Sequence, residues 1–401
     1  MRKKRNFFGM NFNVVLLGIA SLINDLSSEM ITPILPFFIK YLGGSEIIVG
    51  IIGGLRDSIA NILKVLSGYL SDKTGKIKIF VQTGYFTSAV FKTLTAMSLT
   101  WPQLMLFSSL ERTGKGMRDA PRDALLARYA KKRGKVFGFH KTLDTSGAIL
   151  GSILVFLLFW IFKFEYRKII TIAAIIAFTS LIPLYFVKEK KVNNEKKLPK
   201  IGFSKFSKSL KLFLVISGLF SFSNFSYMFL ILKTQQAFPE KLSSTAIPIF
   251  LYILYNIFYA LFAIPVGIFY DKIGRKRIIN LGYFLFSLIC LGFIFAKTLP
   301  MFIFLFILYG MAYASIETNQ RTYVADLSSK TTRGTALGMF YTLTGFLTLL
   351  SSIVAGILWQ KINSTAPFIF GFITSSLAVI LFFACAKKFK KYETMSSEES
   401  V

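Results

Sequence analysis

The sequence predicts an all-α integral membrane protein with twelve transmembrane helices arranged as two pseudo-symmetric six-helix halves. Hydrophobic residues make up 54% of the 401 residues, and the mean hydropathy is +0.58. Apolar runs of about 20 residues recur along the whole chain, long enough to cross roughly 30 Å of hydrocarbon as helices. A short motif also occurs twice, 199 residues apart, which indicates a duplicated unit.

Each apolar run is expected to form one helix, because a bilayer offers no other partners for backbone amides. The first run follows a basic segment, as in a signal peptide, but it is longer than a cleavable core and contains Asp25 and Glu29. We therefore expect an uncleaved first span. The predicted spans are residues 13–39, 47–71, 77–98, 103–120, 137–161, 168–187, 210–232, 245–270, 277–297, 300–323, 335–360 and 364–386.

The net charge of +29 is concentrated in the N-terminal segment and in every second loop, whereas the alternate loops carry few cations. This asymmetry predicts that both termini are cytoplasmic and that the protein lies in the cell membrane as a multi-pass protein. The basic loops lack the interleaved aromatic residues of a platform that stacks bases. A nucleic-acid partner is therefore not expected.

The most polar internal segment divides the chain. Residues 188–211 are rich in Lys, Asn and Glu and are expected to form a cytoplasmic basic linker. The halves would then be residues 1–187 and 212–386. Residues 387–401 change from basic to acidic and serine-rich, which predicts a disordered cytoplasmic tail.

The repeated motif marks a turn after the second helix of each half. Glycine permits a tight reversal there, and an aspartate can accept backbone N–H bonds at a helix start. A second repeat, Gly134 with Gly138 against Gly334 with Gly338, supports the duplication. The residues of the repeated turn are Gly68, Asp72, Gly75 and Lys76 in the first copy and Gly267, Asp271, Gly274 and Arg275 in the second.

These turns resemble the signature of the major facilitator superfamily (MFS) of secondary transporters, and the likeness covers nearly the whole chain. The twelve-helix drug-efflux antiporters are the most similar branch in motifs. Their P-x-x-P pattern resembles Pro33 to Pro36, and their helix-4 motif resembles Arg112 to Gly116. Their helix-5 glycine pattern is matched by Gly138, Gly147 and Gly151, although Ser152 replaces its proline and Val155 its last glycine.

The resemblance implies a fold and several roles. It implies transport by alternating access, and antiport rather than symport. It also implies that Asp72 controls a cytoplasmic gate by holding the two halves together in the outward-facing state. Finally, it implicates Arg112 in proton transfer, through its influence on nearby carboxylates.

Charged residues inside the predicted spans are concentrated in the first half. At about 2.5–3.5 kcal/mol for each residue, eleven such side chains would cost roughly 30 kcal/mol in lipid. They must therefore face one another or a water-filled cavity. The eleven are Asp25, Glu29, Arg56, Asp57, Lys64, Lys92, Glu111, Arg112, Lys115, Lys141 and Asp144.

Carboxylates beside fixed cations could form a proton relay or a static ion network, and both alternatives stay open. Our candidates for proton coupling are Asp25, Glu29, Asp57 and Asp144, together with Arg112. Spacing of four residues predicts pairs within one helix for Glu111 with Lys115 and for His140 with Asp144. Asp25, Glu29 and Asp57 also leave open a site for a hard cation. Zinc is not expected, because His140 is the only histidine.

Polar and aromatic side chains of the second half are expected to face the first half across a central cavity. Several of them are equally compatible with packing alone. Tyr252, Tyr255, Asn256 and Tyr259 recur at helical spacing. The substrate-cavity candidates are Arg56, Lys115, Asn224, Tyr227, Tyr252, Asn256, Tyr259 and Tyr313.

Together these features predict a secondary transporter that expels a small organic compound in exchange for protons. The alternatives are a proton-coupled uptake symporter for a charged metabolite, a metal-ion exporter or a lipid flippase. An enzyme is not expected, because the spans contain no catalytic Ser/His/Asp arrangement, metal-ligand cluster or phosphate-binding glycine loop. We expect no cofactor, and a monomer.

Overall fold

The computed structural model describes residues 6–7, 10–130, 133–189, 206–240, 243–329 and 332–385. Two short strands, β1 (Asn6–Phe7) and β2 (Met10–Asn11), form an antiparallel ladder before the first helix. The helices are α1 (Phe12–Ile31), η1 (Thr32–Ile34), α2 (Leu35–Tyr41), α3 (Glu46–Thr74), α4 (Ile77–Met97), α5 (Trp101–Tyr129), α6 (Arg133–Trp160), α7 (Tyr166–Thr179), α8 (Leu181–Phe186), α9 (Lys208–Ser223), α10 (Met228–Ala237), α11 (Ser243–Ile273), α12 (Arg275–Phe295), α13 (Leu299–Asp326), α14 (Arg333–Lys361) and α15 (Ala366–Ala384).

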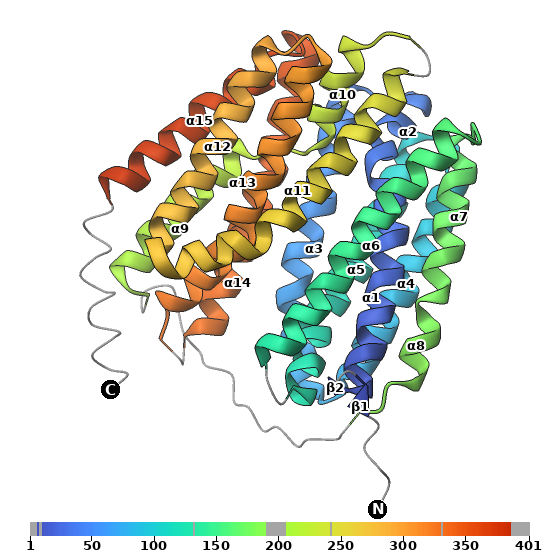
Figure 1. Ribbon diagram of the computed structural model, residues 1–401, viewed down its shortest axis with the longest axis vertical. Helices are drawn as coiled ribbons and strands as arrows, with labels where there is room; N and C mark the ends of the chain where they lie inside the picture. Colours follow the sequence, from blue (N-terminus) through green and yellow to red (C-terminus); the bar gives the residue numbers. More distant parts are fainter. Residues whose placement is uncertain are drawn as a thin grey trace, which may run out of the picture.

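The twelve predicted helical spans are confirmed, although three of them are interrupted (Figure 1). The first consists of α1, η1 and α2, the sixth of α7 and α8, and the seventh of α9 and α10. Nine stretches of the described chain are long and apolar enough to cross a membrane. The other three spans, α3, α4 and α5, are long enough but are more polar, because they carry much of the charge of the first half.

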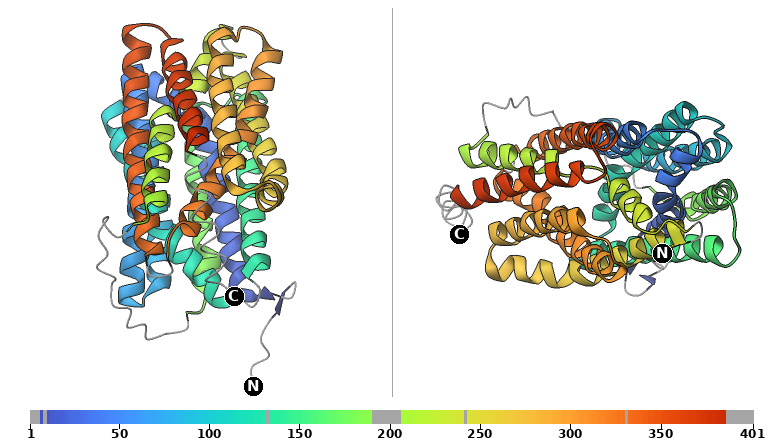
Figure 2. Two further views of the ribbon diagram at one scale, coloured as in Figure 1. Left: turned by 90° about the vertical axis from the view of Figure 1, so that its left-hand side faces the viewer. Right: turned by 90° about the horizontal axis from the view of Figure 1, so that it is seen from above.

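The helices form two groups that lie side by side (Figures 1 and 2), and each group holds six of the twelve spans. One group contains α1 to α8 and the other α9 to α15. The groups pack against each other mainly through α3 with α14 and α6 with α11. We call the end at which α3 leads into α4 the basic end, and the end at which α2 leads into α3 the opposite end.

Backbone contact between the groups is closest toward the opposite end. A Cβ atom added at Gly50 would lie 2.2 Å from the backbone oxygen of Ser352, so α3 and α14 touch there without side chains between them. Toward the basic end, a Cβ atom at Gly338 would meet only the side chain of Val65, at 3.0 Å. The two helices therefore diverge toward the basic end.

The fourth span was predicted too short. We expected residues 103–120, but α5 continues to Tyr129, and α6 begins at Arg133 rather than at residue 137. The added turns keep a buried face, with Leu125 and Leu126 inside the first half, and Pro121 lies within the helix without ending it. An amphipathic extension of this kind lacks the continuous apolar run that marks a span.

Two of the interruptions differ in the way the helix ends. In the first span, Pro33 lies at the start of η1, where its missing N–H ends the regular α-helical bonding. In the seventh span the chain leaves the helix at Asn224 and resumes at Met228. The Ser352 hydroxyl accepts a 3.0 Å bond from the Ser226 amide, which satisfies a backbone group that the break leaves free.

The domain boundaries remain predictions. The described residues of the predicted linker are Lys188 and Glu189 at one end and 206–211 at the other. The predicted tail, residues 387–401, lies outside the described part of the chain.

Candidate functional site

A compact ion cluster lies inside the first half, between α3 and α5. The Glu111 carboxylate is 3.4 Å from an Arg56 guanidinium nitrogen and 3.3 Å from Arg112 Nε. All three side chains are buried, with 3%, 4% and 8% of the surface of Glu111, Arg56 and Arg112 exposed. The predicted pair of Glu111 with Lys115 is therefore wrong, because two arginines hold this carboxylate and Lys115 forms no ion pair in the described part of the chain.

Lys92 joins α4 to α1 beside this cluster, which the spacing analysis did not anticipate. Its ammonium group donates 2.9 Å hydrogen bonds to the hydroxyls of Ser27 and Ser28. The Ser27 hydroxyl in turn donates to the Ala173 carbonyl at 2.6 Å, so its oxygen is free to accept from the lysine. These bonds connect three helices and satisfy a fully buried cation.

A small cavity separates Lys92 from the ion cluster. Its volume is about 10 Å³, room for roughly one water molecule. It is lined by Ser28, Ile31, Arg56, Lys92, Thr95 and Glu111.

Two predicted proton-coupling residues, Asp25 and Asp57, lie half-buried between the helices without a direct partner. Neither carboxylate forms a hydrogen bond or an ion pair with a described residue. Asp25 lies in the field of the like charge of Asp144 and of the cation of Lys115, whereas Asp57 lies in the field of Arg112 and Arg56. Cations therefore act on both carboxylates without a direct ion pair.

Glu29 is placed differently, because it contacts the second half. The Tyr252 hydroxyl on α11 donates a 2.7 Å hydrogen bond to Glu29 Oε2 on α1. A neighbouring bond of 3.0 Å joins the Tyr227 hydroxyl to the Thr32 carbonyl. Since Thr32 begins η1 and Tyr227 precedes α10, the two interrupted spans meet at this contact.

A third bond between the halves involves Asn256. Its amide donates a 2.9 Å bond from α11 to the Ser152 hydroxyl on α6. Ser152 is the residue that stands in place of the proline in the helix-5 glycine pattern. The proline position of that pattern therefore provides a hydrogen-bonding group between the halves in this chain.

The predicted pair of His140 and Asp144 is confirmed. Nδ1 of the histidine lies 3.4 Å from a carboxylate oxygen of Asp144, one turn further along α6. The same carboxylate lies in the field of Arg122 on α5, whose guanidinium donates to the Ser21 hydroxyl at 3.0 Å. This group of polar residues lies between the ion cluster and the basic end.

Five tyrosines of the second half form a continuous cluster that faces the first half. We call Tyr227, Tyr252, Tyr255, Tyr309 and Tyr313 the tyrosine cluster. Centroids of successive rings are between 4.7 and 5.8 Å apart. Such contacts are typical of packed aromatic pairs.

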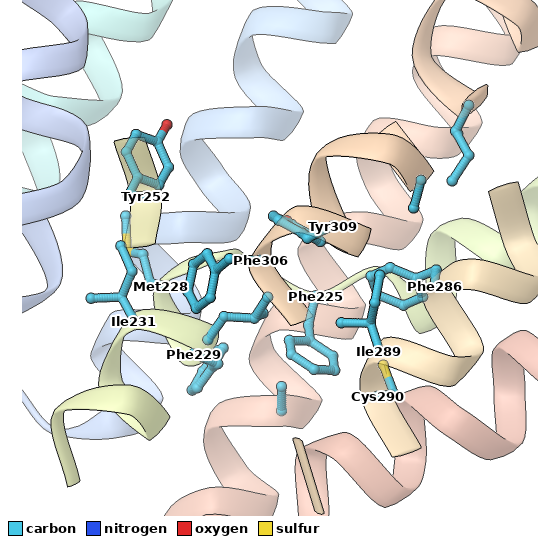
Figure 3. Close-up of a cluster of buried hydrophobic side chains, with 14 of the residues drawn as sticks. Phe225, Met228, Phe229, Ile231, Tyr252, Phe286, Ile289, Cys290, Phe306 and Tyr309 are labelled. Atoms are coloured by element: carbon cyan, nitrogen blue, oxygen red, sulfur yellow. The ribbon is translucent and has the colours of Figure 1, made fainter. Parts of the chain in front are cut away.

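Apolar side chains support the cluster from behind. Figure 3 shows Phe225, Met228 and Phe229 packed among other apolar residues, with the Tyr252 hydroxyl pointing away from Met228. At the other end of the cluster, Tyr313 donates a 2.8 Å bond to the Asn224 side chain at the break between α9 and α10. The break and the tyrosines therefore form one unit.

Charges of the second half meet the first half nearer the basic end. The Tyr259 hydroxyl donates a 2.7 Å bond to Glu317, and the Lys141 ammonium of α6 lies 5.2 Å from the centre of the Tyr259 ring. Arg321 lies 3.9 Å from Glu317. Tyr259 thus contacts opposite charges from the two halves.

The repeated turns keep their glycine geometry. Gly75 and Gly274 have φ values of +68° and +101°, which glycine adopts without a Cβ clash. In the second copy, Arg275 lies 2.6 Å from Asp326 at the end of α13. Gly267 lies in α11, but a Cβ atom there would meet no other atom within 4 Å.

Asp72 does not cap the following helix, which corrects our expectation. It is exposed in the last turn of α3. The first amides of α4, at Ile77 and Lys78, instead donate to the Glu189 carboxylate at 2.8 and 3.2 Å. The side chain of Asp271, the equivalent residue, lies outside the described side chains.

The helix-5 glycines serve close packing within the first half. Cβ atoms at Gly147 and Gly151 would lie 2.3 and 2.2 Å from backbone oxygens of α1, whereas Gly138 faces open space. Gly68 lies against α5, where a Cβ atom would be 3.1 Å from that of Ala120. Among the described residues, no three metal-ligating side chains gather into a cluster that could hold a cation.

Known proteins are similar to this chain in sequence. The family model of the Major Facilitator Superfamily matches residues 17–254 and 216–399. An uncharacterized MFS-type transporter of Methanocaldococcus jannaschii is 49% identical over 373 residues, which cover 92% of this chain and 94% of that protein. The multidrug resistance protein MdtH of Salmonella arizonae is 26% identical over 170 residues, 41% of each chain.

Solved structures match the fold. A crystal structure of a mutant of the nucleoside transporter NupG superposes with a TM-score of 0.78 at 18% identity, and the match covers 94% of this chain and 100% of that one. This similarity concerns the arrangement of the helices.

Proposed function

Because the chain belongs to the Major Facilitator Superfamily and is thus a secondary transporter, we propose that it expels a small organic compound in exchange for protons. The site lies between the halves, where interrupted spans meet near the middle of the bundle. Sites at the interface of related repeats are typical of secondary transporters.

One observation carries the proton-coupled part of the proposal. Asp25, Glu29 and Asp57 lie in membrane-spanning helices of the first half, where Glu29 is bonded to the second half, and none of them forms an ion pair within the described residues. An intramembrane carboxylate is costly and is usually retained for function. Three of them beside Arg112 and Lys115 can bind and release protons as their surroundings change.

Export is favoured over import by sequence similarity. The helix-4 and helix-5 motifs resemble those of drug-efflux antiporters, and the chain shares 26% identity over 170 residues with a multidrug resistance protein. The tyrosine cluster offers an apolar surface with hydroxyl groups, which suits an amphipathic organic compound.

The placement of basic loops supports a specific orientation. We infer that the basic end faces the cytoplasm of the cell, that both termini lie there, and that the protein works as a monomer in the cell membrane. Since α3 and α14 diverge toward the basic end, this conformation corresponds to an inward-facing state. Asp72, which is exposed here, would then hold the halves together in the outward-facing state.

Transport in everted membrane vesicles tests the proposal. Respiration acidifies the vesicle interior, and entry of ethidium, or of compounds first found to raise the melting temperature of the purified protein, is followed by fluorescence. We expect entry that stops when the pH gradient is collapsed. Asp25→Asn and Asp57→Asn should each slow it at least tenfold, an effect of the size expected when a residue in proton transfer is removed.

A surface carboxylate provides the matched control. Glu46 pairs with Lys40 at the opposite end, at 2.7 Å, and its replacement by Gln should leave transport unchanged. Entry that persists without a pH gradient, in wild type and in both aspartate variants, would contradict proton coupling. Lipid translocation under the same conditions would instead identify a flippase.

A second candidate is uptake of an anionic metabolite together with protons. Lys115 favours it, because this half-buried ammonium group forms no ion pair with a described residue and could bind an anionic group. In right-side-out vesicles, acid outside should then drive uptake, and Lys115→Gln should raise the KM for the anion more than it lowers the maximal rate.

A further inference from the structure

Glu29 differs from the other candidate carboxylates in its partner. Asp25 and Asp57 have no hydrogen-bond partner among the residues that the structure describes, and Asp144 pairs with His140 on its own helix. Within the described residues, Glu29 is the one of these four whose carboxylate is bonded to the second half, through the 2.7 Å contact with Tyr252. The contact therefore joins a candidate proton site to the partner half.

The chemistry of this contact depends on charge. An ionised carboxylate accepts hydrogen bonds only, and a bond from a tyrosine hydroxyl to it is stronger than one between neutral groups. A protonated carboxyl is a weaker acceptor and has a proton of its own to donate. Binding of a proton to Glu29 should therefore weaken its bond to Tyr252.

Other charged and titratable groups act on Glu29 from α5, from its own helix and from the second half. Lys115 and Arg112 approach from α5, and Asp25 lies one turn away on α1. From the second half, Tyr227 and Tyr255 lie close enough to interact with it electrostatically. Of all these groups, the Tyr252 hydroxyl is the one that is hydrogen-bonded to Glu29.

Tyr252 is also connected to the rest of the second half. Its ring centre lies 5.8 Å from that of Tyr227 and 5.4 Å from that of Tyr255, so it belongs to the tyrosine cluster. Pro248, one turn before it, and Pro265 each remove a backbone hydrogen bond from α11. This helix can therefore bend when the Tyr252 contact changes.

We propose that Tyr252 is the residue through which the second half senses the charge of Glu29: the hydrogen bond holds the halves together while Glu29 is ionised and releases them when it is protonated. The inference rests on the proposed proton-coupled function and deepens it. It makes Tyr252 a positioning residue, separate from any contact its ring makes with a substrate.

The test measures conformation against pH in the absence of substrate. Spin labels are attached at Lys73→Cys and Ile273→Cys, which place one label on each half at the basic end, after Cys290 and Cys385 are replaced by Ala. The purified protein in lipid nanodiscs is then examined by double electron–electron resonance between pH 5 and pH 9. For the wild type we expect a distance distribution that changes with pH around one midpoint.

Removal of the Tyr252 hydroxyl should weaken this transition. The Tyr252→Phe variant keeps the ring but loses the bond through which the charge of Glu29 acts on the second half, so we expect the pH-dependent change in distance to shrink severalfold. Any transition that remains should have a midpoint higher by about one to two pH units, because the lost bond favours the ionised carboxylate. Glu29→Gln, which probes the contact from its other side, should abolish the transition. Adding Tyr252→Phe to it should then have no further effect on the distances.

Tyr283→Phe is the matched control. It removes a tyrosine hydroxyl of the same half that accepts a 2.6 Å bond from Gln320, far from Glu29 in the fold. We expect it to lower thermal stability and to leave the pH-dependent change in distance at its wild-type size. The inference is overturned if Tyr252→Phe keeps the full wild-type transition, or if Tyr283→Phe reduces the transition equally.

The vesicle assay separates this inference from the proposed function. If wild-type transport depends on the pH gradient but Tyr252→Phe keeps the full pH-dependent transition, proton coupling stands and the role of Tyr252 falls. If the wild-type distances do not respond to pH and transport needs no gradient, both proposals are wrong.

Discussion

The contact between α3 and α14 predicts how a single methyl group should shift the conformational equilibrium. In Gly50→Ala, the added Cβ would lie 2.2 Å from the Ser352 backbone oxygen on the other half. Ordinary contacts of a Cβ atom begin at 3.4 Å, so the helices must separate by roughly 1 Å or distort. Overpacking of this kind costs about 1–3 kcal/mol.

The same clash can be placed within one half for comparison. In Gly151→Ala, the added Cβ would lie 2.2 Å from the Leu26 backbone oxygen on α1, which belongs to the same half. Strain at Gly50 is relieved when the halves part at the opposite end, whereas strain at Gly151 persists in every state. We therefore expect Gly50→Ala to favour opening at the opposite end about 5- to 150-fold, and Gly151→Ala to lower stability instead.

Spin labels at the opposite end measure this shift. Tyr41 and Ile362 are 66% and 65% exposed and lie on different halves, so cysteines there are accessible to labels. Gly138→Ala is the neutral control, because its Cβ would meet nothing within 4 Å. If Gly50→Ala leaves the distances unchanged and lowers the melting temperature as much as Gly151→Ala, this contact is not one that opens.

Three further predictions concern stability and gating. Glu111→Gln should destabilise the protein by about 3–5 kcal/mol, because it leaves two buried arginines without their carboxylate. Lys115→Met should lower the stability less. Thermal unfolding in detergent compares the two variants. Glu189→Ala should lower the stability by about 1 kcal/mol and speed hydrogen exchange of the first α4 amides. Glu165→Ala is the control, because Glu165 precedes a helix without a capping bond, and it should have neither effect. Asp72→Asn should leave the inward-facing state intact and depopulate the outward-facing one. Equal cysteine accessibility in variant and wild type would contradict a gating role for Asp72.

The spans were predictable because each one depends on local composition. Continuous apolar runs identified the long helices, and the positive φ of Gly75 followed from its place in a tight turn. The pair of His140 and Asp144 was also predictable, because both residues lie on one face of one helix. These features require no knowledge of neighbouring helices.

The interior of the first half could not be predicted in the same way. Spacing along α5 pairs Glu111 with Lys115, but rotation of the helix against α3 brings Arg56 to that carboxylate. The cap on α4 comes from Glu189, more than one hundred residues along the chain from the amides it binds. Such contacts depend on how the helices pack against one another, and helix packing cannot be derived from the pattern of a single sequence.

The polarity of α3, α4 and α5 has a consequence for biogenesis. None of these three helices is as apolar as the nine stretches whose length and composition suit a membrane span. The Arg56–Glu111 contact joins α3 to α5, and Lys92 joins α4 to α1. These contacts keep the charges away from lipid in the folded protein, so we expect loss of one partner to lower the yield of inserted protein as well as its stability.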